Sequence, residues 1–270
     1  MRGLFTAGVT DVFLENGITF DAMIGVSAGA AFGCNFKSGQ AGRVLRYNLN
    51  YCRDPRYCSI RSLIKTGDMF GADFCYREMP QKLDIFDYGA YNKNPLKFYV
   101  VATDLESGAP VYRECPVSDD ECFEWIRASA SMPLVSRTVR IGDFLLLDGG
   151  VADSVPLRFF ESSGYSKNVV VLTQPDGYVK GPNKALALIK LKYRKYPRFV
   201  EAMAHRHEHY NATLEYIKLR EKAGNVCVIR PERKLEMGRI ERDPAVLSDV
   251  YECGRLAALG CIDKIKEFLK

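Results

Sequence analysis

Gly25-Val26-Ser27-Ala28-Gly29 is the stretch that decides the fold, because it sets a serine between two glycines directly after the apolar run at residues 22–24. A Gly-x-Ser-x-Gly sequence between a strand and a helix is typical of a nucleophile elbow. The turn needs strained backbone angles and close approach to neighbouring elements, which a β-carbon at either glycine would obstruct. It leaves the Ser27 oxygen at a helix N-terminus, where the helix dipole favours a developing oxyanion. The alternative is a small-residue helix start that Ser27 merely caps.

A second signal lies far along the chain, in Asp148-Gly149-Gly150. Residues 144–147 form a short apolar run that predicts a buried strand ending at the aspartate. An aspartate in that place, followed by a thin glycine backbone, is suited to face a nucleophile at the carboxyl edge of a sheet. Alone, Asp-Gly-Gly is a common turn. Together, the two signals predict that Ser27 and Asp148 meet.

Composition and length are those of one sizeable globular domain. The 270 residues are 47% hydrophobic and 26% charged, and apolar runs fall short of the roughly 20 residues of a transmembrane helix. Thr10 and Asp11 interrupt any signal-peptide core near the start. The nine cysteines form no Cys-x-x-Cys pair, which disfavours a zinc ribbon and favours reduced thiols. We therefore expect a cytoplasmic protein without cofactor or metal.

The net charge of +5 is mild, and Lys and Arg are thinly spread except at residues 190–195. This cluster is interpreted as a solvated surface rather than a nucleic-acid patch, although it also suits anionic lipid headgroups. The chain therefore predicts no nucleic-acid partner.

Strands alternating with helices predict an α/β fold with three layers, α/β/α, around a central, mostly parallel sheet. A single domain over 1–270 is expected, with the motifs in residues 1–157 and a helical part at 175–270. Residues 39–93 are predicted to form a helical cap. The other predicted helices are 2–15, 121–130, 199–223 and 244–269. The other predicted strands are 96–103, a short one around 111–112, 137–141, 168–173 and 226–229.

A serine hydroxyl needs a base that takes its proton. The three histidines, His205, His207 and His209, fall in one stretch of a charged helix. The order Ser27, Asp148, His fits an α/β-hydrolase triad, but in that fold the elbow follows several strands and the histidine sits on a loop. A metal site at His205 and His209 lacks acidic or cysteine partners at fixed spacing. If no histidine serves, Asp148 is the base of a Ser–Asp dyad at the strand C-terminal edge.

These residues resemble the patatin-like phospholipases, which use a Ser–Asp dyad. Three further stretches match the family in the same order. Arg2-Gly3 resembles the end of its Gly-Gly-Gly-x-Arg-Gly oxyanion loop. Ala102-Thr103-Asp104-Leu105 resembles a block of its bacterial members, and residues 128–133 resemble its Ala-Ser-x-x-x-Pro segment. The resemblance implies a serine hydrolase of lipid esters or phospholipids, with Ser27 as nucleophile and Asp148 as general base. The elbow and oxyanion residues expected from it are Gly3, Gly25, Ala28, Gly29 and Gly149.

The oxyanion glycines that precede the variable residue in the family are missing, because this chain begins at that residue, Met1. Met1 is then an internal methionine, or the chain has been trimmed, or the protein is a degenerate relative. The in-frame upstream sequence is expected to encode a short apolar strand and two or three glycines. The alternative function is a non-catalytic lipid- or acyl-binding protein.

Aromatic and basic residues within 47–91, including Arg53 and Arg56, predict an acyl-chain entrance that contacts lipid phosphate, a possible membrane-surface contact. Ordinary helical packing with a charged solvated face is the equal alternative. Oligomeric state is not predicted.

Overall fold

The central sheet is organised around β2 (Lys97–Asp104), which is buried over most of its length. In the computed structural model, which describes residues 1–238 and 240–270, β2 pairs in parallel with β1 (Ala22–Val26). It pairs antiparallel with β3 (Pro110–Glu114) and β5 (Phe144–Asp148), and β5 pairs antiparallel with β4 (Val139–Ile141). The sheet is therefore mixed, not mostly parallel as the sequence predicted. The short turns β2–β3 and β4–β5 make hairpins, which join antiparallel strands.

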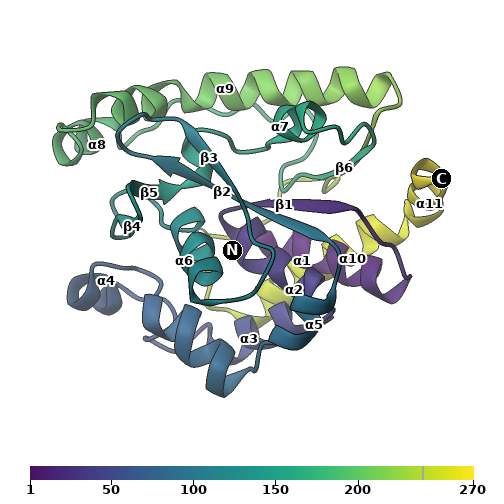
Figure 1. Cartoon of the computed structure of the whole chain (residues 1–270), viewed down its shortest axis with the longest axis horizontal. Coiled ribbons are helices and arrows are strands. Elements are labelled where there is room, and N and C mark those ends of the chain that lie inside the picture. Colours follow the sequence, from purple (N-terminus) through teal and green to yellow (C-terminus); the bar gives the residue numbers. More distant parts are fainter. Residues whose placement is uncertain (239) are drawn as a thin grey trace.

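A separate pair of strands, β6 (Asn168–Val171) and β7 (Val226–Ile229), is parallel. Between them the chain forms α8 (Leu186–Lys192) and α9 (Pro197–Lys222), the helical crossover that parallel pairing requires. In Figure 1, α9 spans the upper side of the molecule above the strands.

Helices cover both faces of the central sheet (Figure 1). Neighbouring residues of β5 illustrate the two layers: Leu146 packs in a cluster with side chains of α2 (Ala28–Lys37) and α6 (Asp120–Ser129), whereas Leu147 packs with side chains of α8 and α9. Side chains alternate along a strand, so consecutive leucines face opposite layers. The predicted three-layer α/β/α class is confirmed.

The predicted cap between β1 and β2 is helical. It contains α3 (Arg43–Tyr51), α4 (Ile60–Thr66), a π-helix, η1 (Phe74–Leu83), and α5 (Tyr88–Lys93). These elements occupy the lower side of Figure 1. Two short elements, the 3-10 turn η2 (Gly149–Val151) and α7 (Leu157–Ser162), follow β5.

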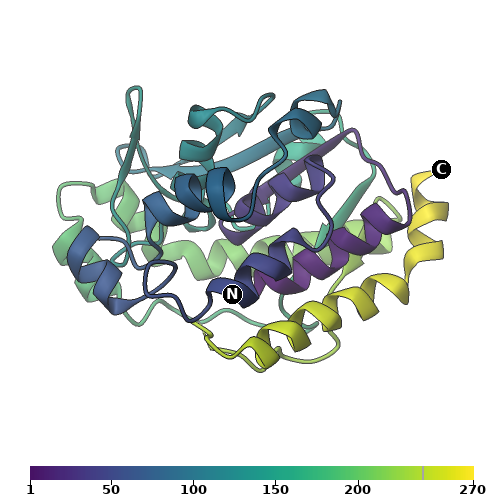
Figure 2. The ribbon, with the colours of Figure 1, turned by 90° about the horizontal axis from the view of Figure 1, so that it is seen from below.

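The C-terminal part returns to the N-terminal helix. α10 (Pro244–Leu259) lies beside α1 (Gly3–Glu15), as Figure 2 shows, and α11 (Ile262–Leu269) follows it. The single helix predicted for 244–269 is thus two helices. Tyr251 donates its hydroxyl to Asp11 at 2.6 Å, and the α10 residue Arg255 pairs with Glu15 at 2.7 Å.

Two glycines let α1 and α10 approach closely. A Cβ built on Gly8 would lie 2.1 Å from the Tyr251 carbonyl oxygen, and one built on Gly254 would lie 2.0 Å from the Phe5 carbonyl oxygen. Neither neighbour is a flexible side chain, so any larger residue must push the helices apart.

We expect Gly254→Ala to lower the free energy of unfolding by about 1–3 kcal/mol, because overpacking a close helix contact forces a backbone shift. Urea denaturation measures this loss. Gly260→Ala is the control, because its Cβ would meet nothing closer than the Leu256 oxygen at 3.4 Å. Equal stability of the two variants would contradict the close-packing account.

Candidate active site

Ser27 sits in a strained turn between β1 and α2. Its backbone has φ 56° and ψ −120°, and Ser27 and Leu134 are the two non-glycine residues with positive φ in the described part of the chain. Strain of this kind persists only where the surroundings enforce it. Here the Ser27 N–H donates to the hydroxyl of Ser129, a fully buried residue at the end of α6, at 2.8 Å.

Strand register brings the second residue to the first. Val26, the last residue of β1, lies opposite Val101 of β2, and Asp148, the last residue of β5, lies opposite the next residue, Ala102. Because β3 occupies the other edge of β2 over residues 99–103, β1 and β5 must share one edge. β1 is parallel to β2 and β5 is antiparallel, so their C-terminal ends meet head to head.

The side chains meet where these strand ends meet. The Ser27 hydroxyl donates to Asp148 Oδ2 at 2.6 Å, and the Gly150 N–H donates to Asp148 Oδ1 at 2.8 Å. The Asp148 N–H donates to the carbonyl of Ser131 at 2.8 Å. Each carboxylate oxygen therefore has a donor. The last residue of α6 and the loop that follows it hold Ser27 and Asp148 in place.

Burial raises the pKa of Asp148 above its usual value, and the hydrogen bond from Ser27 and the positive charge of Arg206 act against this shift. Arg206 lies on α9, and its guanidinium donates to the carbonyl oxygen of Gly150. A Cβ built on Gly150 would lie 3.0 Å from Asp148 Oδ1 and 3.1 Å from Arg206 Nη2. The carboxylate and the guanidinium thus flank one glycine.

The predicted elbow glycines have different roles. A Cβ on Gly25 would lie 2.6 Å from the backbone of Ala30, and a Cβ on Gly149 would lie 2.1 Å from the Val101 carbonyl oxygen. A Cβ on Gly29 would meet nothing within 4 Å. Steric closeness therefore explains Gly25 and Gly149, whereas the expectation that Gly29 is needed for close approach is wrong.

Two helix N-termini converge beside the serine. Gly3 begins α1, Ala28 begins α2, and a Cβ on Gly3 would lie 2.7 Å from the Ala28 Cβ. The first N–H groups of a helix have no acceptor within the helix and carry the positive end of its dipole. This corner therefore favours negative charge.

Three residues that support the site were not predicted as site residues. They are Ser129, Thr103 and Arg206; the first two lie within the matched motifs, and Thr103 donates to the Asp148 carbonyl at 2.9 Å. Arg206 belongs to no motif that could have indicated it from the sequence. Its neighbours His205 and His207 were considered there instead, as a possible base or metal ligand.

Two of the three histidine side chains bond within their own helix. His205 faces Glu208 at 3.0 Å, and His207 Nδ1 lies 3.1 Å from the Ala204 carbonyl oxygen. Arg206, between them, is the residue of this stretch that reaches the Asp148 turn.

Arg56, in the cap, forms ion pairs with neighbouring carboxylates. It pairs with Asp54 at 2.8 Å and Glu78 at 2.9 Å and lies over the Phe74 ring. Phe74 itself packs edge-on against Tyr51. These contacts favour the helical-packing alternative for this part of the cap over a lipid-phosphate contact.

Comparison with known proteins decides the family. The family model described as patatin-like phospholipase matches residues 1–160, more than half of the chain. The chain belongs to the patatin-like phospholipase family. Family membership supports a lipid hydrolase in general, and the Ser27–Asp148 contact lies within the matched region.

The C-terminal part matches a different model. Residues 196–270 match a domain of unknown function (DUF6363), and this region contains α10 and the residue that reaches the Asp148 turn, Arg206. The chain is also 27% identical over 271 aligned residues to the "Uncharacterized protein YjjU" of Escherichia coli (strain K12), covering 94% of this chain and 72% of that protein.

The described part of the chain contains no helix long and apolar enough to cross a membrane.

Proposed function

We propose that this protein is a serine lipid acyl hydrolase, an esterase of the phospholipase A or lysophospholipase type, in which Ser27 is the nucleophile and Asp148 the general base. The observation that carries the proposal is the 2.6 Å hydrogen bond from the strained Ser27 to Asp148. Ser27 has a positive φ and donates its hydroxyl to a buried carboxylate. This arrangement suits transfer of the hydroxyl proton to the carboxylate as the serine attacks an ester carbonyl.

In the proposed reaction, Ser27 Oγ attacks the carbonyl carbon of a lipid ester while its proton moves to Asp148 Oδ2. The oxyanion develops beside the N-termini of α1 and α2, which stabilise it. When the ester C–O bond breaks, the leaving alcohol takes the proton from Asp148, and an acyl-serine remains. Water then cleaves the acyl-serine by the same route, with Asp148 again accepting and returning the proton.

The matched regions are proposed to act as one catalytic domain over residues 1–270. Two contacts support this: α10 packs closely on α1, and Arg206 donates to Gly150. A cytoplasmic location and a phospholipid substrate are further parts of the proposal.

A fluorophosphonate probe tests the chemistry directly. We expect the folded protein to be labelled at Ser27, because the probe reacts with a serine that a neighbouring base activates. Ser27→Ala should remain unlabelled and folded, as judged by circular dichroism. A folded wild-type protein that resists labelling would point instead to a non-catalytic lipid- or acyl-binding protein.

A further inference from the structure

One end of the molecule exposes apolar side chains on two helices. On α4, Ile60 and Ile64 are 68% and 82% exposed, and on α8, Leu188 and Leu191 are 60% and 68% exposed. The members of each pair are four or three residues apart and so lie on one helical face. A helix that packs only within its own domain would turn such side chains inward.

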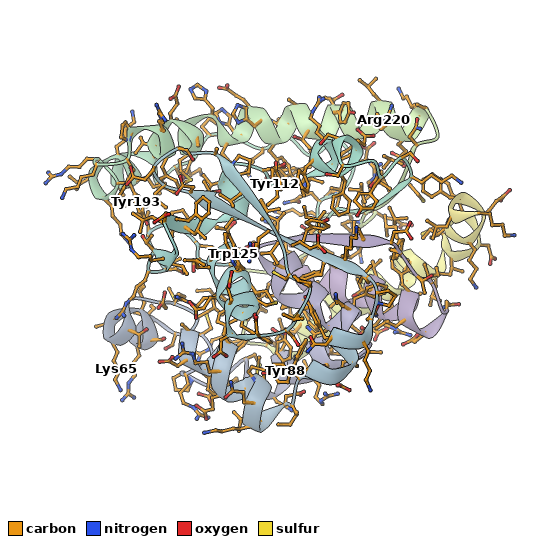
Figure 3. The ribbon with its side chains drawn as sticks, in the orientation of Figure 1. Lys65, Tyr88, Tyr112, Trp125, Tyr193 and Arg220 are labelled. Carbon is orange, nitrogen blue, oxygen red and sulfur yellow. The ribbon has the colours of Figure 1, made fainter. Side chains whose placement is uncertain are left out.

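The two helices lie at the same end of the molecule, and Figure 1 shows β4 and β5 between them. Both are at the left of Figure 1 and again at the left of Figure 2. Figure 3 places Lys65 of α4 and Tyr193, the residue after α8, on that side. The loop after α6 joins their surroundings, because the Leu134 N–H donates to the Tyr193 hydroxyl at 3.3 Å and the Met69 N–H donates to the Val135 carbonyl at 2.8 Å.

The charge of this end has one dominant sign. From residue 190 to residue 195, at the end of α8 and just after it, the sequence has four Lys and Arg residues and no Asp or Glu. α4 adds Arg61 and Lys65, again without an acid. The β4–β5 hairpin, which lies between the helices in Figure 1, contributes an exposed pair of opposite sign, Arg140 on β4 and Asp143 in the turn. We call the surface formed by α4 and α8 the α4/α8 face; its residues are Ile60, Arg61, Ile64, Lys65, Leu188, Lys190, Leu191, Lys192, Arg194 and Lys195.

The α4/α8 face adjoins the candidate active site. The loop after α6, which contacts Met69 and Tyr193 beyond the ends of the two helices, contains Ser131, whose carbonyl accepts from the Asp148 N–H. Met132, the next residue, is 36% exposed, and Leu134 holds a left-handed φ of 73°. A surface bound at the α4/α8 face would therefore lie near the loop that holds Asp148.

We propose that the α4/α8 face docks on an anionic lipid bilayer, with the isoleucines and leucines entering the interface and the lysines and arginines meeting the headgroups. Apolar side chains surrounded by Lys and Arg are the composition of an interfacial membrane-binding helix, and each basic residue near an anionic surface adds to the affinity. The inference rests on the proposed lipid hydrolase function, since docking would deliver the substrate. It also moves the expected membrane contact from Arg53 and Arg56 to this face.

Sedimentation with vesicles tests docking without catalysis if it is done on Ser27→Ala protein. We expect binding to vesicles of phosphatidylcholine with phosphatidylglycerol, weaker binding to phosphatidylcholine alone, and weakening by salt. Lys190→Glu with Lys192→Glu should lower the partition coefficient on anionic vesicles by about tenfold or more, because each basic residue near the surface contributes about 1 kcal/mol. Ile64→Asp with Leu191→Asp should lower binding to both kinds of vesicle.

Matched controls come from the opposite end. Lys264→Glu with Lys266→Glu changes two exposed lysines of α11, and Leu219→Asp changes a 64% exposed leucine next to Arg220, which Figure 3 places at the far end of α9. Both controls should bind as the parent does. Equal losses in the controls, or no binding to anionic vesicles, would overturn the proposal, as would binding to a nucleic acid or an acidic protein in place of vesicles.

Hydrolysis of a small soluble ester, measured with Ser27 intact, separates this proposal from the proposed function. The α4/α8 variants should retain that hydrolysis while losing vesicle binding. An inactive wild-type protein that still binds vesicles would refute the hydrolase and leave the docking face standing.

Discussion

Asp148→Asn is expected to lower kcat for a small soluble ester by about 10²–10⁴-fold, the contribution of a general base. The triple replacement of His205, His207 and His209 by Gln should leave kcat within about tenfold, because these side chains act as no base in the proposed mechanism. Steady-state kinetics on both proteins measure the contrast. An equal loss in a well-folded triple variant would refute the dyad and revive the triad.

The pH dependence follows from the burial of Asp148. The proposed reaction needs an ionised carboxylate, and burial raises the pKa of Asp148 above the ordinary 3.8. Activity should therefore fall as the pH drops through this raised pKa, so the acid limb of kcat/KM lies above the range of an exposed aspartate.

The same shift predicts that Asp148→Asn folds well. A raised pKa means that the folded state binds the Asp148 proton more tightly than the unfolded state does. The ionised carboxylate then costs stability at pH values above its folded pKa, and this cost disappears below the unfolded pKa. Removing the charge should leave the thermal midpoint at neutral pH unchanged or raised, which makes a loss of kcat attributable to chemistry.

Arg206→Gln is expected to move the acid limb of kcat/KM upward by about one pH unit, because an opposite charge near a carboxyl lowers its pKa by about 1–3 units. Arg206 favours the ionised form of Asp148, so its removal leaves more of the base protonated. Near the acid limb the rate should fall about tenfold, while KM and the high-pH plateau change little. Arg206→Lys should restore part of the shift.

The control is Arg198→Gln, which removes an exposed arginine from the same helix. It should leave the pH profile in place. If Arg206→Gln lowers kcat equally at every pH, Arg206 only braces the Gly150 carbonyl and has no electrostatic role.

The local chemistry of the chain was enough to predict the family, the elbow and its serine. The requirement for glycine at positions 25 and 149 could be predicted from the sequence motifs. The structure gives the reason, because a Cβ at either position would collide with neighbouring backbone. The strands β1, β2 and β5 were likewise predicted, since apolar runs bounded by turn residues are local signals. The alternation of strands and helices predicted the wrong strand direction: it indicated a mostly parallel sheet, whereas β3 and β5 are antiparallel to β2, and β4 is antiparallel to β5.

By itself, then, the sequence determined which residues belong to the elbow and the Asp-Gly-Gly turn, because those choices depend on steric limits within a few residues. Only the tertiary structure decided that β1 and β5 meet end to end along β2, so that Ser27 and Asp148 come within 2.6 Å. It also brought Arg206 to Gly150 from α9. Such contacts depend on strand register and helix packing between distant segments, which no local pattern of residues encodes.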